Sequence, residues 1–134
     1  MPRPEQPQLP HRLLRKAQSD LTAARALADD PDQGDDVIGF HVQQAVEKSV
    51  KAVLASLDVD YPRTHDIDYL VRQLAKRDIA VPHALLEARW VSMWGVFTRY
   101  DDLETVLDRV AAIDVATVAI EWARSSIPAP PELP

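Results

Sequence analysis

The spacing of proline is the feature that most constrains how this chain can fold. Of its eleven prolines, four lie in residues 1–10 and four in residues 128–134. The other three are Pro31, Pro62 and Pro82. Because proline removes a backbone donor and clashes with the preceding turn, long helices can run only between these positions. We predict disordered, Pro-rich tails over residues 1–10 and 126–134 and one folded domain over residues 11–125.

Between the prolines, apolar residues recur every three or four positions, as on one face of a helix. In residues 11–28 these positions are Leu14, Ala17, Leu21, Ala24 and Leu27. No segment alternates as a strand would, and the chain has only three glycines. The pattern predicts helices over about residues 11–28, 35–57, 83–97 and 101–125. It also predicts a short helix, capped by Thr64 or Asp66, between the helices over residues 35–57 and 83–97.

The predicted inner faces follow from the same spacing. For the short helix they are Ile67, Leu70, Val71 and Leu74, and for the next helix they are Leu86, Trp90, Trp94 and Phe97. For the last helix they are Leu103, Val106, Leu107, Val110, Ile113 and Trp122, with Asp101 and Glu104 at capping-box spacing. Amphipathic helices joined by short connectors bury their apolar faces against one another. The fold class is therefore all-α, an antiparallel up-and-down bundle of four to five helices.

Composition excludes several classes of function. Cysteine is absent, so disulfides and thiolate metal sites are excluded, and no apolar run reaches the roughly 20 residues that span a bilayer. The first residues lack the apolar stretch of a secretory signal, so we expect a cytoplasmic protein without membrane contact. A net charge of −6 argues against broad affinity for nucleic acid. Glycine-rich phosphate loops and catalytic or metal-binding motifs are missing, and we predict neither a metal nor a cofactor.

The second helix carries an ordered polar row, formed by His41, Gln44, Lys48 and Lys51. Charged rows on helices are usually solvated faces, and that is one interpretation. The other is a contact surface in which the two ammonium groups bind the phosphates of nucleotide or RNA, or a partner protein. Gln43 and Glu47 share this arc and can cross-link helices through hydrogen bonds. Glu47 also precedes Lys51 by four residues, the favourable order for an ion pair within a helix.

Three sequence blocks resemble the HEPN family (higher eukaryotes and prokaryotes nucleotide-binding domain). They are Phe40-His-Val-Gln-Gln-Ala-Val-Glu-Lys-Ser-Val-Lys-Ala-Val-Leu54, then Pro62-Arg-Thr-His-Asp-Ile67, then Arg99-Tyr100. Each block is weak alone, but the three occur in the expected order over about residues 13–122. The resemblance implies an antiparallel helical bundle that dimerises. It also implies a small nucleotidyltransferase partner for many relatives, and RNA cleavage by toxins of toxin–antitoxin systems for others.

The ribonucleases of this family use an arginine followed, after four to six residues, by a histidine, and two copies meet at the dimer interface. The counterpart of that arginine here is Arg99, yet Tyr100 and the residues after it contain no such histidine. A phenol is a poor base near neutral pH. Arg77 and His83 match the spacing, but they lie in a different block, and we interpret that match as coincidence. A ribonuclease of this sequence would therefore need a distant histidine, His65 or His41.

Three functions stay open. The first is a non-catalytic HEPN-like module that binds nucleotide or RNA, as a homodimer and as partner of a nucleotidyltransferase in a toxin–antitoxin-type system. The second is a metal-independent endoribonuclease that uses Arg99 with His65. The third is a purely structural helical dimer. The predicted nucleotide- or RNA-binding residues are His41, Gln44, Lys48, Lys51, Arg63, His65, Arg99 and Tyr100.

Overall fold

The structure, a computed structural model, describes residues 8–96 and 106–129. Over these two ranges the chain is helical and has no strand, which confirms the all-α bundle. The six helices of these ranges are α1 (Leu9–Ala28), α2 (Asp35–Ser56), α3 (Ile67–Ala75), α4 (His83–Leu86), α5 (Arg89–Val96) and α6 (Arg109–Ser126).

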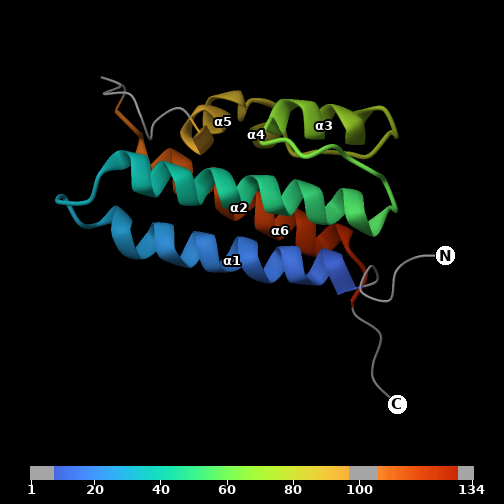
Figure 1. Cartoon of the computed structure of the whole chain (residues 1–134), viewed down its shortest axis with the longest axis horizontal. Coiled ribbons are helices and arrows are strands. Elements are labelled where there is room, and N and C mark those ends of the chain that lie inside the picture. The colour runs from blue at the N-terminus through green and yellow to red at the C-terminus, as the bar shows by residue number, and fades with distance from the viewer. Residues whose placement is uncertain (1–7, 97–105, 130–134) are drawn as a thin grey trace, which may run out of the picture.

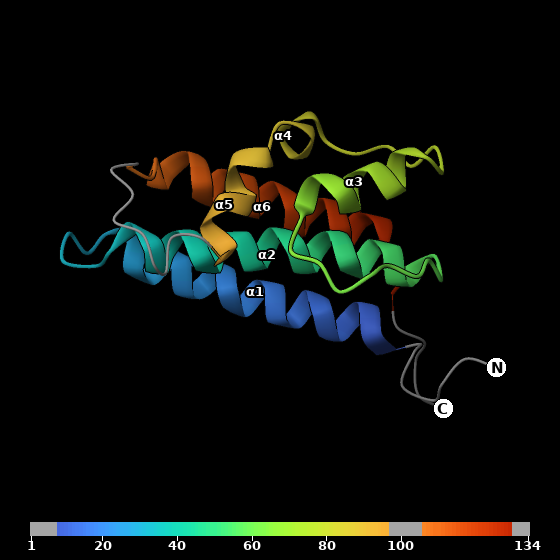
Figure 2. The ribbon, with the colours of Figure 1, turned by 45° about the horizontal axis from the view of Figure 1, so that its top comes forward.

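Three long helices form the body of the bundle, and three short ones form a second layer on it. α1, α2 and α6 lie side by side, each in contact with the other two (Figure 1). The short helices α3, α4 and α5 pack on α2 and α6, as the turned view in Figure 2 shows. α2 therefore lies at the centre and contacts α1, α3, α5 and α6. A helix covered on so many sides must find protein partners for its polar side chains.

Local signals in the sequence explain where α1 and α3 begin. α1 begins at Leu9, two residues before the predicted start, and the buried Pro10 fits its first turn, where no backbone donor is needed. Asp66 caps α3, because its side chain accepts a hydrogen bond from the backbone N–H of Tyr69 at 3.1 Å. Thr64 instead accepts the N–H of Asp66 at 3.1 Å. The predicted inner residues of α3 are all buried.

The predicted helix over residues 83–97 is wrong in its continuity and in its inner face. A turn at Glu87 and Ala88 separates α4 from α5. Leu86 is 47% exposed and Trp90 36% exposed, whereas the buried residues are Leu85, Ala88, Val91 and Trp94. The turn breaks the helical period, so residues before and after it no longer share one face. Of the four predicted inner residues, Trp94 is confirmed, and Phe97 lies outside the described residues.

The last helix begins later than predicted. Residues 106–108 are not helical, and Asp108 caps α6 by accepting the N–H of Ala111 at 3.0 Å. Val106 and Val110 are exposed and not core, while Leu107 is buried and Ile113 and Trp122 pack against the core. Asp101, Leu103 and Glu104 lie outside the described residues.

Arg109 fixes the place where α6 starts. Its guanidinium donates to the Asp35 carboxylate at 2.9 Å and to three backbone carbonyls of the α1–α2 connection, those of Ala28, Asp30 and Gln33. The other Asp35 oxygen accepts the N–H of Leu107 at 3.1 Å. One arginine thus joins the ends of α1, α2 and α6, because its fork of donors suits several acceptors at once.

Candidate functional site

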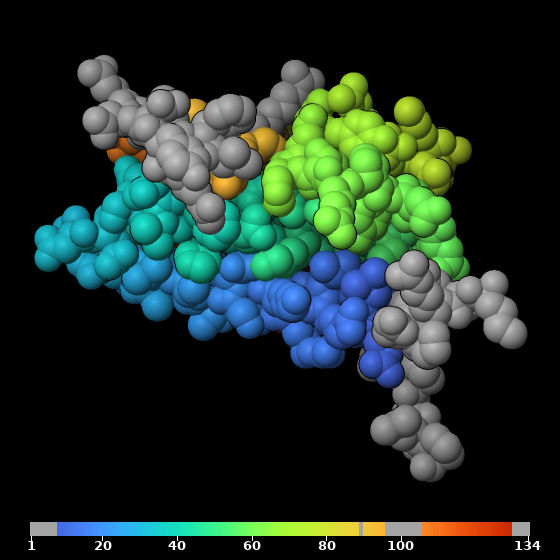
Figure 3. Space-filling view, in the orientation of Figure 1, coloured from blue at the N-terminus to red at the C-terminus, as the bar shows by residue number. Residues whose placement is uncertain are grey.

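The polar side chains of α2 form one arc between α1 and the connection from α2 to α3, and two of them, Gln43 and Glu47, are buried. They recur every three or four positions and so share one face of the helix. We call this set the α2 polar arc: His41, Gln43, Gln44, Glu47, Lys48 and Lys51. In Figure 3, α1 lies below α2, and the chain leading into α3 lies above α2.

Glu47 is the centre of the arc on the side of residues 57–66. The residue is only 4% exposed. One carboxylate oxygen lies 2.7 Å from His65 Nδ1 and accepts the Gln43 amide at 2.9 Å, and the other accepts from Lys51 Nζ at 3.2 Å. A buried carboxylate is costly unless it is paired and hydrogen-bonded, and here both oxygens have partners.

Gln43 connects this carboxylate to the backbone of the next segment. It is fully buried, donates weakly to the His65 carbonyl at 3.4 Å and accepts the Gln44 amide at 2.7 Å. A Cβ on Gly95 would stand 2.8 Å from the Gln43 side chain, so glycine lets α5 close over it. Within the described residues, Gln43 and Glu47 form hydrogen bonds along α2 and to His65, so they tie α2 to the α2–α3 connection and not, as predicted, to another helix. The predicted place of these two side chains on the outer arc of α2 is wrong, because the α2–α3 connection and α5 cover them.

Asp20 of α1 organises the other side of the arc. Its two oxygens bind His41 Nδ1 at 3.0 Å and Lys48 Nζ at 2.6 Å. Asp20 is not among the predicted site residues. A short loop joins the first two helices, so they must pack antiparallel. An acidic residue on the polar side of the first helix could therefore have been expected to pair with the basic residues of the second.

The solvated-face interpretation of the polar row is therefore wrong for three of its four members. His41, Lys48 and Lys51 are partly buried and bound to carboxylates. Each lysine on this arc has a carboxylate at hydrogen-bond distance, which neutralises much of the charge that a phosphate would meet. The row is first of all a set of ties between α1, α2 and the chain leading to α3.

Two basic side chains next to the arc remain open to solvent. The His65 side chain is 60% exposed although its Nδ1 faces Glu47. Arg63 is exposed and forms no hydrogen bond or ion pair within residues 8–96 and 106–129. Arg99 and Tyr100 lie outside the described residues. The predicted convergence of Lys48, His65 and Arg99 therefore stays a prediction. Lys48 and His65 bind different carboxylates, those of Asp20 and Glu47.

Tyr61 closes the arc beside Lys51. The ammonium of Lys51 lies 5.6 Å from the centroid of the Tyr61 ring, within range of a cation–π contact. Burial, and secondarily the negative charge of Glu47, raise the pKa of the Tyr61 phenol above its ordinary value of 10.0. The phenol is therefore held in its neutral form, and it is no base at neutral pH.

The raised pKa of Tyr61 predicts a loss of stability at alkaline pH. The unfolded chain releases the phenol proton near pH 10, whereas the folded chain holds it to higher pH. The stabilising contribution is thus complete below pH ~10 and is lost as pH rises through the folded pKa. Urea unfolding at about pH 9 and about pH 11 should show a larger loss for the wild type than for Tyr61→Phe. Equal losses in the two proteins would contradict the shift.

Metal-ligand clusters and membrane-spanning helices are two further features that a site or a surface could have. Across residues 8–96 and 106–129, no group of three or more histidines and carboxylates is placed to hold a metal ion. Nor does any helix in this part of the chain combine the length and apolarity needed to cross a membrane.

Comparison with known proteins decides the family. A family model described as HEPN domain matches residues 10–126, which is most of the chain and includes the whole α2 polar arc. The chain belongs to the HEPN family. No curated protein and no solved structure matches it. The HEPN domain here is thus an all-helical module of a nucleotide- and RNA-related family, and the resemblance drawn from three short blocks is confirmed.

Proposed function

We propose that this HEPN domain binds nucleotide or RNA without cleaving it, through the surface formed by residues 59–66 and the adjoining α2 polar arc. One observation carries the proposal. Arg63 has no partner among the described residues, and it lies two positions from His65, which a buried carboxylate holds in place. A free guanidinium next to a fixed imidazole offers donors for a phosphate at a defined position.

The charges of the arc favour Arg63 over the lysines as the phosphate contact. Lys48 and Lys51 each have a carboxylate within 3.2 Å, so a phosphate would have to compete with Asp20 or Glu47 for them. Arg63 has no such competitor in the described part of the chain. Lys48 and Lys51 then stabilise the structure of the site, whereas Arg63 and His65 contact the ligand.

The proposal extends to assembly. Two copies of this surface in a homodimer would double the basic groups that a single strand of RNA can reach. A nucleotidyltransferase encoded with this chain, in a toxin–antitoxin-type system, is the partner that family membership suggests. Co-purification of the two proteins, together with the measured mass of the complex, tests this part separately from ligand binding.

Binding is tested with labelled single-stranded RNA and with ATP at two salt concentrations. We expect saturable binding that weakens with salt, and about a tenfold loss of affinity in Arg63→Ala. Arg77→Ala is the matched control, because it removes one positive charge from an exposed arginine whose guanidinium binds only the Gln73 carbonyl in the described chain. Equal losses of affinity in the two variants would mean that net charge alone, and not a contact with Arg63, determines binding. If neither RNA nor ATP binds at low salt, the purely structural dimer becomes the favoured function.

A second candidate, a metal-independent ribonuclease, is favoured by the geometry of Glu47 and His65. The carboxylate lies 2.7 Å from Nδ1 and the imidazole is exposed, so Nε2 is free to accept a proton from a ribose 2′-hydroxyl. The 2′-oxygen would form a bond to the adjacent phosphorus as the P–O5′ bond breaks, and the 5′-oxygen would leave with a proton from water, giving a 2′,3′-cyclic phosphate. RNA cleavage in the presence of a chelator that disappears in His65→Gln supports this candidate. Intact RNA at high protein concentration counts against it.

A further inference from the structure

The two ends of α1 carry opposite charges. α1 begins beside the end of α6, and a short connection joins it to α2 at the other end of the bundle (Figure 1). Residues 8–19, at the beginning of α1, contain three lysines or arginines and no acidic residue. Residues 29–36, which form the connection, contain five aspartates and no basic residue. Charge is therefore separated along α1, with a basic start and an acidic connection after it.

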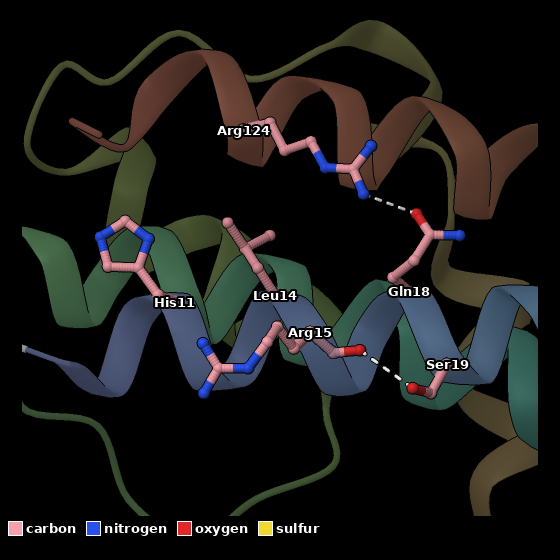
Figure 4. Close-up of a pocket in the computed structure, with 6 residues that line it drawn as sticks. All are labelled: His11, Leu14, Arg15, Gln18, Ser19 and Arg124. Carbon is pink, nitrogen blue, oxygen red and sulfur yellow. Dashed lines mark hydrogen bonds between the residues drawn. The ribbon is translucent and has the colours of Figure 1, made fainter. Parts of the chain in front are cut away.

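The basic end contains a hollow between α1 and the last turns of α6. Its volume is about 570 Å³, and it is lined by His11, Leu14, Arg15, Gln18, Ser19 and Arg124. Arg124 donates to Gln18 Oε1 at 2.7 Å, whereas the Arg15 guanidinium has no partner within residues 8–96 and 106–129. In Figure 4 the two guanidinium groups point away from each other. One small anion cannot reach both groups, so the hollow suits a chain segment that carries several carboxylates.

The acidic connection between α1 and α2 has the matching charge. Four of its five aspartates are exposed and form no ion pair within the described ranges, namely Asp29, Asp30, Asp32 and Asp36. Asp35 is bound by Arg109, which also holds three backbone carbonyls of the connection. The four carboxylates are thus carried on a backbone that the fold already holds. Such a segment loses little conformational freedom when it binds.

The connection cannot reach the hollow of its own chain. Arg15 and Asp29 are fourteen residues apart along α1, which is about 21 Å at ~1.5 Å per residue. Only the connection of another copy can therefore meet the hollow. Both surfaces also offer an apolar contact, because Leu14 lines the hollow and Val37, 39% exposed, follows Asp36.

We propose that the hollow binds the α1–α2 connection of a second copy, so that copies of the chain associate head to tail. Arg15 and Arg124 pair with different aspartates of the connection. Arg12 and Lys16, exposed on the neighbouring face of α1, extend the positive surface. Because two different surfaces meet, each pair keeps one free hollow and one free connection, and association continues into rings or longer chains. The contact uses none of the residues of the proposed nucleotide- or RNA-binding surface.

Sedimentation equilibrium over a range of protein concentrations tests the contact. We expect the average mass of the wild type to rise with concentration, and the association constant to fall about tenfold or more between about 50 and about 300 mM salt. The hollow variant Arg12→Glu/Arg15→Glu/Arg124→Glu should lose this association. If that variant does not fold, as judged by circular dichroism, Arg12→Glu/Arg15→Glu serves instead, because neither side chain has a partner in the described chain. A wild type of constant mass at both salt concentrations overturns the proposal.

A variant of the opposite surface completes the test. The connection variant Asp29→Lys/Asp30→Lys/Asp32→Lys should also lose association when it is alone. In an equal mixture of the hollow variant and the connection variant, every hollow can meet a connection of opposite charge. We expect that mixture to associate within about threefold of the wild type at about 150 mM salt. A mixture that does not associate overturns the proposal.

A matched control separates the contact from net charge. Arg72→Glu/Lys76→Glu/Arg77→Glu makes the same change of charge as the hollow variant, on exposed residues of α3 and its end that do not line the hollow. This control should associate within about threefold of the wild type at about 150 mM salt, where charges more than ~8 Å apart are largely screened. Equal losses of association in the control and the hollow variant would show that net charge governs association, and would overturn the proposed contact.

Discussion

Replacing Glu47 with alanine is expected to lower the free energy of unfolding by about 3–5 kcal/mol, the usual cost of removing one partner from a buried ion pair. Glu47 is 4% exposed, and its carboxylate is the common acceptor for Gln43, Lys51 and His65. Without it, the partly buried Lys51 ammonium keeps its charge without a counter-ion, and the Gln43 amide loses its shorter hydrogen bond. The chain leading into α3 loses the contact that fixes His65.

Urea unfolding at neutral pH measures this effect. Glu121→Ala is the matched control, because Glu121 lies exposed on α6 and its removal changes the net charge equally. Surface changes of that kind shift stability by about 0.5 kcal/mol or less. In Glu47→Ala the NMR signals of His65 should move to the positions of a solvated histidine. A loss of less than about 1 kcal/mol would mean that water already solvates the carboxylate and that Glu47 does not hold the loop.

The fold could be predicted from the sequence because helical spacing and capping residues are local signals. The starts of α2 and α3 follow from acidic residues at their N-termini, Asp35 in the first turn of α2 and Asp66 as the cap of α3. The errors lie where a tertiary contact overrides the local pattern. Arg109, which is hydrogen-bonded to the α1–α2 connection, determines where α6 starts. The turn at Glu87 interrupts the helical period and so changes which of the following residues face the core.

The site could be predicted only in part, because the sequence shows which residues share a helix face but not what covers that face. The spacing of polar residues predicts the polar row of α2, and the sequence block over residues 62–67 indicates His65. The ion pair from Asp20 to Lys48 joins residues 28 positions apart, and only the packing of α1 on α2 brings them together. The hollow at Arg15 and Arg124 joins residues still farther apart in the chain, so no periodicity in one helix could indicate it.

Replacing Trp94 with alanine is expected to cost about 3–5 kcal/mol of unfolding free energy, as for other large aromatic residues in a core. Trp94 is 4% exposed and packs on the backbone of α2 at Gly39. A Cβ at Gly39 would stand 2.6 Å from ring atoms of Trp94, closer than two carbons can approach. Gly39→Ala should therefore also destabilise the protein, by about 1–3 kcal/mol, since an inserted methyl in a packed core forces its neighbours to move.

The two substitutions together should cost less than the sum of their separate effects. In Trp94→Ala the ring that blocks Gly39 is gone, so the new methyl enters empty space. Alanine is also favoured over glycine inside a helix by about 0.5–1 kcal/mol. Gly39→Ala should thus change from destabilising in the wild type to neutral or stabilising in the Trp94→Ala background. A double-mutant cycle by urea unfolding measures the change, and additive effects would show that α5 does not pack on α2 at this point.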